Sequence, residues 1–392
     1  MSILSVIIPT HNRQRYALNA ITAILENFPN TEVVVSDTSD SRELEQKLFY
    51  WIETGRLIYD HPNEAYDVVA NFENGLTLAT GEYLIFLGDD DCLGPDAERI
   101  AYWAQGEGLD AVACSLNATY GWPDFISKYF KDGYSAKLAI NPYDGLIEPS
   151  DCLVELKACL DNLGAGVLKM PRAYLGMISR NLVSRIQMKY GRLFGGVSPD
   201  IYSAALISVE CSKFVRLNYP FILPGSSGAS TSGQSASGAH RGALRNNDHI
   251  GAFKSLIWDE LIPEFYSVPT VWSYSLLKAL EKIGSSDLLP NYPRLYIKCL
   301  LYHSSYFTET LASIRFCMSK FGVLKITRLL IIEFFRECVM QGKRIARRVR
   351  NPKATADACV IANLMCISDA YRALAEYTSN NNTKLNLISK YF

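Results

Sequence analysis

The chain has 392 residues, of which 48% are hydrophobic and 20% are charged, a composition that excludes a disordered or fibrous protein. At about 100–200 residues per domain, this length predicts two domains or one large domain with an extension. The net charge of −1 gives no general attraction to a nucleic-acid backbone, so no nucleic-acid partner is expected. The ten cysteines form no CxxC pair and have no zinc-finger spacing, which indicates reduced thiols and predicts a cytoplasmic protein.

The first 116 residues alternate between short apolar runs and segments with helical spacing. Five apolar runs predict strands at 4–9, 31–37, 56–62, 82–88 and 110–116. Four segments predict helices at 15–28, 42–52, 68–80 and 95–105, the last with Pro95 in its first turn. This alternation predicts βαβ units, and therefore an α/β fold with a doubly wound, mostly parallel sheet covered by helices on both faces.

The rest of the chain has a different pattern. Residues 117–180 are rich in aromatic residues, glycine and proline, which predicts loops and short elements over the sheet edge. A helix is expected next, with Ser198 as its N-cap and Pro199 in its first position. The Gly/Ser-rich segment 224–247 predicts a mobile loop. From about residue 250 to its end the chain predicts helices, for example over 254–262.

Polar residues follow three of the predicted strands, at Pro9–Asn12, Asp37 and Asp89–Asp91. Ligands of parallel sheets bind beyond the carboxyl ends of the strands, so these residues are expected to share one edge. If the backbone stays extended, Asp89 and Asp91 point the same way and Asp90 points elsewhere. Two carboxylates that face one space repel each other unless a hard cation lies between them, which predicts a magnesium or manganese site. The alternative is a solvated acidic turn in which Asp91 caps the following helix.

Other polar residues have two interpretations each. Asp37 can accept a hydrogen bond from the imide N–H of uracil or thymine, or it can form an Asx turn or an N-cap. Asn12 lies at the first strand end, where it can contact a ligand. Asp200 is a candidate general base, although a carboxylate in the first turn of a helix is also favoured by the helix dipole. His240 and Arg241 follow the Gly/Ser segment and can close over a diphosphate, or they can lie in a surface loop.

A basic segment, 341–353, directly follows the amphipathic run 321–335. This combination predicts an interfacial helix attracted to anionic lipid. The alternative is an ordinary packed helix with a solvated basic end. No stretch reaches the roughly 18 apolar residues that a transmembrane helix needs.

Four stretches, SVIIPTHNR, VVVSDTSDS, NFENGLTLATGEYLIFLGDDD and GGVSPD, together resemble the family 2 glycosyltransferases with the GT-A fold. The resemblance is close over about residues 3–116 and thins over 117–260. It implies a catalytic domain over 1–260, with 1–116 as its nucleotide-binding half and 117–260 as its acceptor half, which contains the mobile loop. Residues 261–392 resemble nothing that we can name and are expected to form a helical extension that contacts the membrane.

The resemblance also implies roles for individual residues. Asp37 would bind the nucleotide base, and Asp89 and Asp91 would form the DxD pair that holds Mn²⁺ or Mg²⁺ on the diphosphate. Asp200 would be the catalytic base. Further nucleotide-sugar contacts are expected from Pro9, Thr10, Asn12, Asp90, His240 and Arg241. Two departures from the family pattern are Phe72-Glu73, where Arg-Asn is frequent, and Pro199-Asp200, where Glu-Asp is frequent.

The expected reaction is a single displacement with inversion, in which a sugar moves from a nucleotide diphosphate donor to a hydroxyl of the acceptor. A UDP-sugar donor is expected. The expected acceptor is a saccharide, free or lipid-linked, in surface polysaccharide (O-antigen or capsule) biosynthesis at the inner face of the cell membrane. The first alternative is a nucleotidyltransferase, which would release pyrophosphate. The second is a non-catalytic relative whose C-terminal helices dock a partner.

Overall fold

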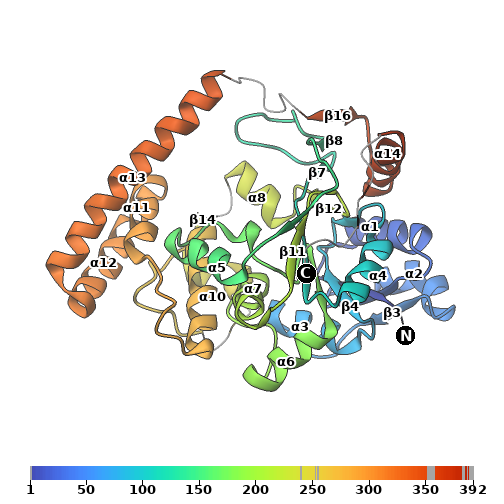
Figure 1. Ribbon diagram of the computed structural model, residues 1–392, viewed down its shortest axis with the longest axis horizontal. Helices are drawn as coiled ribbons and strands as arrows, with labels where there is room; N and C mark the ends of the chain where they lie inside the picture. Colours follow the sequence, from blue (N-terminus) through green and yellow to red (C-terminus); the bar gives the residue numbers. More distant parts are fainter. Residues whose placement is uncertain are drawn as a thin grey trace.

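A computed structural model describes residues 2–238, 241–251, 253, 256–350, 358–381, 385 and 387 (Figure 1). A central mixed sheet has helices on both of its faces, and a group of C-terminal helices lies to one side. The predicted class, an α/β fold with a mostly parallel sheet and a C-terminal helical extension, is confirmed.

Eight strands form the main sheet: β1 (Leu4–Thr10), β2 (Glu32–Asp37), β3 (Leu57–Asp60), β4 (Tyr83–Phe86), β6 (Ala111–Cys114), β9 (Ile147–Pro149), β10 (Gly176–Ser179) and β11 (Phe214–Leu217). Their order is β3-β2-β1-β4-β10-β6-β11-β9. The first four strands are parallel, as is the pair β6 and β11, whereas β10 runs antiparallel to both of its neighbours and β9 is antiparallel at one edge. Thr10 pairs with Asp37 in register, so the carboxyl ends of β1 and β2 lie side by side.

The two faces of the sheet are covered by different helices. One face packs against α1 (Gln14–Asn27), α2 (Glu43–Glu53), α4 (Ala97–Glu107) and α14 (Ile367–Asn380). The other face packs against α3 (Val68–Leu78), α5 (Cys152–Asp161), α6 (Arg180–Tyr190), α7 (Pro199–Glu210) and α10 (Val268–Ile283). In β1, Val6 and Ile8 belong to the first core and Ile7 to the second, and all three are fully buried. Burial on both faces explains why this strand is a continuous apolar run.

Three smaller sheets are also present in the described residues. The first has four strands, β7 (Ala118–Gly121), β8 (Lys137–Ile140), β13 (Gly225–Ser226) and β16 (Cys359–Ala362). The other two are the pairs of β5 (Cys92–Leu93) with β12 (Ile222–Leu223) and of β14 (Arg241–Gly242) with β15 (Tyr266–Ser267). The expectation of helices from about residue 250 to the end was wrong at β16, which pairs antiparallel with β8. Val360 and Ile361 are β-branched, and the segment gains backbone partners there, which outweighs the weak local signal. Residues 256–262, the described part of the helix expected over 254–262, form no helix either.

The Gly/Ser-rich segment 224–247 contains more regular structure than its composition predicts. Besides β13 and β14, it forms α8 (Thr231–Ser237), whose N-cap Ser230 accepts a hydrogen bond from the Gly233 N–H at 3.1 Å. A Cβ at Gly233 would lie 2.0 Å from the Ser227 carbonyl oxygen, so this close packing requires glycine. One further correction concerns Pro95, which precedes the N-cap Asp96 of α4 and is not in its first helical turn.

The C-terminal helical group consists of α11 (Tyr292–Tyr302), α12 (Phe307–Phe321) and α13 (Val323–Arg350). Arg294 of α11 is fully buried and pairs with Glu333 at 3.6 Å and with Glu337, both on α13. These ion pairs fix the long helix α13 against α11. Within the part of the chain that the structure describes, no helix is both long enough and apolar enough to cross a membrane.

Candidate active site

The three consecutive aspartates lie just beyond β4, at the edge of the sheet where β1 and β2 also end. Asp89, Asp90 and Asp91 are each 2–3% exposed. The Thr10 hydroxyl at the end of β1 donates to Asp89 Oδ2 at 2.8 Å, so the predicted meeting of strand ends is observed. Since all three carboxylates are buried, the alternative of a solvated acidic turn is wrong.

Arg13 lies between two of these carboxylates. Its guanidinium contacts Asp89 Oδ1 at 2.6 Å and Asp90 Oδ2 at 3.1 Å, and it also donates to the Ser227 hydroxyl at 2.7 Å. Burial raises the pKa of the Asp89 carboxyl, and the charge of Arg13 opposes this rise. The positive charge that three adjacent carboxylates need is thus supplied in part by the protein itself.

The segment around β13 holds the other two aspartates. Asp90 Oδ2 accepts hydrogen bonds from the Ser227 N–H at 3.0 Å and the Ser227 hydroxyl at 2.7 Å. Asp91 accepts from the Gly225 N–H at 2.7 Å, the Gly88 N–H at 2.8 Å and the Tyr174 hydroxyl at 3.0 Å. Burial, together with the neighbouring Asp90 carboxylate, raises the pKa of the Asp91 carboxyl.

These contacts correct the predicted orientation of the aspartates. Asp89 and Asp90 share Arg13, whereas Asp91 turns toward Gly225 and Tyr174. The expected alternation fails because β4 ends at Phe86, and Asp89 and Asp90 lie in a turn. Asp91 does not cap the following helix, since its oxygens accept the bonds given above.

The donor atoms at this site can be tested against a divalent cation, which prefers oxygen ligands. Asp89 Oδ1 is buried, and its partner among the described residues is the charged guanidinium of Arg13 at 2.6 Å, so it is an oxygen that a cation can use. The guanidinium of Arg13 occupies the space beside it, and a metal held by Asp89 would replace that contact. Over the described ranges of the chain, no three metal-ligating side chains surround a common position. The assignment of the metal to Asp89 and Asp91 stays a prediction.

Asp37 lies fully buried at the end of β2. Its Oδ1 accepts from the Ser39 N–H at 2.9 Å, which is the Asx turn named above as the alternative, and its Oδ2 accepts from the Tyr59 hydroxyl at 2.7 Å. Burial and this hydrogen bond raise the pKa of Tyr59, so the phenol remains a donor. Contact with a nucleotide base stays a prediction for Asp37.

Pro9 and Asn12 lie at the end of β1. Pro9 pairs in register with Ser36 of β2 and is partly buried. Asn12 has a φ of 54° and exchanges two hydrogen bonds with Asp40, one from Asn12 Nδ2 to the carboxylate at 2.8 Å and one from the Asp40 N–H to Asn12 Oδ1 at 2.9 Å. This pairing tightens the turns that follow β1 and β2. Contact with the nucleotide sugar stays a prediction for Pro9, Thr10 and Asn12.

Asp200 lies in the first turn of α7, which begins at Pro199 and has Ser198 as its N-cap, as predicted. The Ser198 hydroxyl donates to Asp200 Oδ1 at 2.7 Å. Burial raises the pKa of the Asp200 carboxyl, while Ser198 and the buried Arg172 lower it. Burial and the charges of Asp91, Asp90 and Asp200 raise the pKa of the partly buried Tyr174, which donates its hydroxyl hydrogen to Asp91.

His240 and Arg241 were predicted to contact the diphosphate of the donor, and only Arg241 lies within the described residues. His240 lies outside the described residues. Arg241 is exposed on β14, which pairs with β15, and its charge lowers the pKa of His303. None of the interactions recorded for Arg241 within the described residues involves the aspartate cluster, so its contact with the donor stays a prediction.

Comparison with known proteins places part of this site in a family. Residues 5–148 match the model of the family "Glycosyl transferase family 2". These residues form a family 2 glycosyltransferase domain. The domain contains Thr10, Arg13, Asp37 and the three aspartates, whereas Tyr174 and Asp200 lie beyond the match.

Two curated glycosyltransferases are similar to this domain. The putative colanic acid biosynthesis glycosyl transferase WcaA of Escherichia coli is 33% identical over 145 residues, which are 35% of this chain and 52% of that protein. A GalNAc(5)-diNAcBac-PP-undecaprenol beta-1,3-glucosyltransferase of Campylobacter jejuni is 38% identical over 93 residues, which are 22% of this chain and 29% of that protein. The chain therefore spans about half or less of the length of these relatives.

One solved structure illustrates the limit of the comparison by shape. The crystal structure of S. aureus TarS in complex with UDP-GlcNAc covers 87% of this chain and 92% of its own, with 14% identity and a TM-score of 0.45. A likeness at this level carries no argument about the ligand of this glycosyltransferase domain.

Sequence reasoning missed four residues that shape the site: Arg13, Arg172, Tyr174 and Ser227. Arg13 stands in the stretch SVIIPTHNR that carries the family resemblance, so a signal for it was present. Tyr174 and Ser227 come from segments that gave no signal, because their contacts join residues 83 and 137 positions apart in sequence.

Proposed function

We propose that the chain is an inverting glycosyltransferase that moves a sugar from a nucleoside diphosphate donor to a hydroxyl of a saccharide acceptor. The observation that carries this proposal is the buried cluster of Asp89, Asp90 and Asp91 at a sheet edge, where the Thr10 hydroxyl and Arg13 also converge. The family match over residues 5–148 supports it.

The donor end of the site would hold the nucleoside diphosphate. Three carboxylates face one guanidinium, so an anionic diphosphate needs an added cation in order to bind here. We propose that Asp89 and Asp91 hold Mn²⁺ or Mg²⁺, which offsets the charge of the leaving diphosphate. Arg13, once released from Asp89, can bind phosphate oxygens through its guanidinium. A uridine donor is proposed because a carboxylate at the end of β2, Asp37, can accept from the imide N–H.

The acceptor end of the site would use Asp200 as general base. A raised pKa brings a carboxylate closer to the working pH and makes it a better proton acceptor. The acceptor oxygen forms a bond to the anomeric carbon as the bond from that carbon to the diphosphate oxygen breaks. The hydroxyl proton passes to Asp200, and the diphosphate leaves with the electron pair. A single displacement of this kind inverts the configuration.

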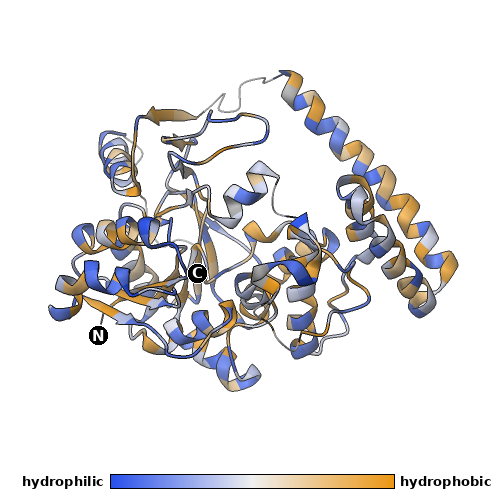
Figure 2. Cartoon of the chain, turned by 180° about the vertical axis from the view of Figure 1, so that it is seen from behind, coloured by the Kyte–Doolittle hydropathy of each residue, from blue (hydrophilic) through white to orange (hydrophobic). Residues whose placement is uncertain are grey.

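The acceptor is proposed to be a saccharide, free or lipid-linked, at the inner face of the cell membrane in surface polysaccharide (O-antigen or capsule) biosynthesis. The names of the two curated relatives support this class. Helix α13 also supports it, because exposed apolar residues repeat along it and basic residues follow (Figure 2). The exposed apolar residues are Leu324, Ile331, Phe335, Val339, Ile345 and Val349. The exposed basic residues at its end are Lys343, Arg344, Arg347 and Arg350.

Membrane contact can be tested by sedimentation with vesicles. Vesicles that contain phosphatidylglycerol are expected to pellet the protein, those of phosphatidylcholine alone to pellet less, and salt to weaken the difference. Phe335→Glu places a charge on the apolar stripe and is expected to reduce pelleting. Met188→Glu, at an 81% exposed position of α6, is the matched control and is expected to have no effect. Equal pelleting of all proteins with both vesicles would contradict the proposal.

The decisive test of the reaction is Asp200→Asn. Turnover of a nucleotide sugar, followed by release of the nucleoside diphosphate, is expected to fall by about 10²–10⁴-fold. Calorimetry with uridine diphosphate and Mn²⁺ is expected to show unchanged binding. Asp151→Asn is the control, since Asn retains the N-cap of α5 away from the site. Release of pyrophosphate would favour a nucleotidyltransferase, and failure to bind any nucleotide would favour a non-catalytic relative.

A further inference from the structure

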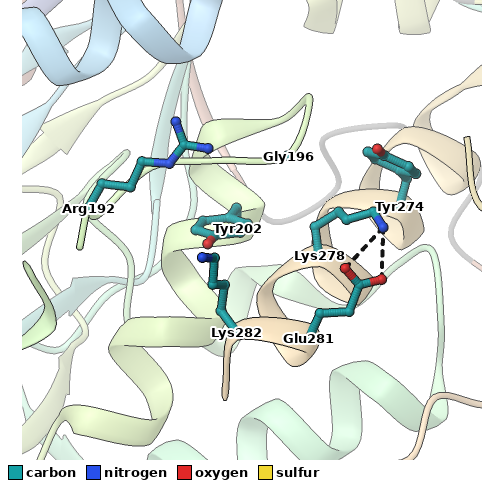
Figure 3. A pocket seen from close by; sticks show the side chains of 7 residues that line it. All are labelled: Arg192, Gly196, Tyr202, Tyr274, Lys278, Glu281 and Lys282. Carbon is teal, nitrogen blue, oxygen red and sulfur yellow. Dashed lines mark hydrogen bonds and ion pairs between the residues drawn. The ribbon is translucent and has the colours of Figure 1, made fainter. Parts of the chain in front are cut away.

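A cavity lies beside the turn that leads into α7, and the proposed reaction does not use it. Its volume is about 410 Å³. It is lined by Arg192 and Gly196 on one side, by Tyr202 of α7, and by Lys278, Glu281 and Lys282 of α10 (Figure 3). Asp200 and Tyr202 are two residues apart, so they point to opposite sides of α7. The cavity is therefore distinct from the face that carries the proposed base.

The charged side chains in this cavity do not balance. The Lys278 ammonium donates to both carboxylate oxygens of Glu281, at 2.8 and 3.0 Å. Arg192 and Lys282 are exposed, and neither forms an ion pair with any residue that the structure describes. The nearby carboxylate of Glu73 accepts a hydrogen bond from the Phe194 N–H at 2.7 Å instead. Burial raises the pKa of Glu73 and the charge of Arg192 opposes this rise, so the three cations at the cavity face two carboxylates and one positive charge is left over.

Hydrogen-bond donors also predominate around the inner wall. Lys282 and Arg192 line the same cavity as the ring of Tyr202 (Figure 3). The body of Tyr202 is buried, and a Cβ at Gly195 would lie within 2.9 Å of its ring, which fixes the position of the phenol. Two cations and a phenol offer donors at one place, which suits a ligand with several acceptor oxygens.

The cavity is connected to the proposed base by a short chain of contacts. Gly196 has a φ of 67° and packs against Ser275 of α10. The Ser275 hydroxyl accepts from the N–H groups of Val197 at 3.2 Å and Ser198 at 2.9 Å, and Ser198 donates to Asp200. The helix that carries Lys278 and Lys282 therefore also supports the turn that orients Asp200.

We propose that this cavity binds an anionic group, phosphoryl or carboxylate, through Arg192, Lys282 and Tyr202. The group can belong to the acceptor or to a separate small anion, since both present the same oxygens to the cavity. Binding itself does not depend on the proposed function. Only the proposed effect of the bound anion on Asp200 rests on the proposed function.

Calorimetry with inorganic pyrophosphate and with glucuronate tests the site, with glucose as the neutral comparison. The wild-type protein is expected to bind at least one of the two anions, more weakly as salt is raised, and not glucose. Arg192→Gln/Lys282→Gln is expected to weaken that binding by about tenfold or more. The matched control Lys278→Gln/Glu281→Gln removes one charge of each sign and is expected to retain it. Glu281→Gln alone removes a negative charge from the cavity and is expected to strengthen anion binding.

Titration of the same samples with uridine diphosphate and Mn²⁺ separates this proposal from the proposed function. The double variant is expected to bind the nucleotide as the wild type does. Absence of binding of both anions to the wild type, or equal binding in Arg192→Gln/Lys282→Gln, would overturn the anion site whatever the nucleotide result.

An acceptor group and a separate anion can then be distinguished by hydrolysis of the nucleotide sugar in the absence of acceptor. A separate anion that acts through the turn is expected to change this rate when it is added to the wild type, and not in the double variant. If the added anion binds but the rate of nucleotide-sugar hydrolysis stays unchanged, the cavity is assigned to an anionic group of the acceptor.

Discussion

Two clusters of buried charge in this protein differ in their balance. At the sheet edge, three carboxylates, Asp89, Asp90 and Asp91, face the single guanidinium of Arg13. Between α11 and α13, the carboxylates of Glu333 and Glu337 surround Arg294, with Lys298 close by. The first cluster carries an excess of negative charge, whereas the second is balanced, because Arg336 and Asp161 add one further charge of each sign beside Glu333.

The difference indicates what each cluster does. Lys298 donates three hydrogen bonds, to both oxygens of Asn162 and to the Leu163 carbonyl, and Arg294 is fully buried, so the second cluster is closed within the protein. In the first cluster the cation, Arg13, is 22% exposed, so this cluster is less enclosed than the second. Loss of one partner from a closed buried pair leaves an uncompensated charge, whereas an unbalanced buried cluster in this position is a candidate binding site.

The largest expected effect comes from Arg294→Met. This change leaves Glu337 buried without its arginine partner and leaves Glu333, among the described residues, only its pair with Arg336, so the free energy of unfolding is expected to fall by about 3–5 kcal/mol. Denaturant unfolding measures it. Arg372→Met is the control, because Arg372 is 72% exposed and its pair with Asp369 is expected to contribute less than about 1 kcal/mol. Equal losses in the two variants would contradict the closed character of the second cluster.

Arg13→Gln tests whether the first cluster lacks positive charge. Without Arg13 the three carboxylates repel one another, and a loss of about 1–3 kcal/mol in unfolding free energy is expected. Mn²⁺ is expected to recover part of this loss, because a cation that binds only the folded state stabilises it. Thermal unfolding with and without Mn²⁺ measures the recovery. Arg294→Met should show none, and recovery there would show that the two clusters are alike.

Asp89→Asn should affect binding more than stability. Removal of one carboxylate from a cluster with excess negative charge reduces repulsion, which offsets the lost contact with Arg13. The affinity for uridine diphosphate in the presence of Mn²⁺ is expected to fall by about tenfold or more, because one of the proposed ligands of the cation loses its charge. Calorimetry measures the affinity, and denaturant unfolding measures the stability of the same variant. A large loss of stability with intact binding would assign a structural role to this cluster.

The smallest expected effect is a shift of the pH profile. Burial raises the pKa of Asp200 above the ordinary value of an aspartate, about 4, so turnover is expected to fall as pH is lowered through that raised value. Ser198→Ala removes a donor to the ionised carboxylate and should raise the pKa further, which moves the acid limb to higher pH by about one unit or less. Profiles of turnover against pH for the two proteins measure the shift. An acid limb that stays in place would contradict the role of Asp200 as base.

The sequence predicted the main sheet well because its strands are buried on both faces and appear as continuous apolar runs. It did not predict that β10 is inserted antiparallel between β4 and β6, since a strand in either direction has the same apolar pattern. It also missed β16, whose pairing with β8 joins segments more than 200 residues apart. Local spacing predicts elements, and pairing over long distances is decided by the packed core.

The candidate site was likewise predicted in part: its position in the fold was predicted, and the orientation of its side chains was not. The meeting of Thr10, Asp37 and the aspartates followed from the rule that ligands bind at the carboxyl ends of parallel strands. The orientation of Asp89 and Asp91 did not follow, because their turn is shaped by Arg13 and by the backbone of Gly225. Contacts from residues remote in sequence thus set the geometry that the motif alone leaves open.

The pairing of β16 with β8 has a consequence for the order of synthesis. Residues 137–140 leave the ribosome more than 200 residues before residues 359–362, which provide their partner strand. Ile367, Ala370 and Leu374 of α14 complete the core beside α1 later still. A nascent chain therefore carries an unpaired strand edge and an uncovered apolar surface during most of its translation. Premature termination before residue 359 would leave both exposed to aggregation.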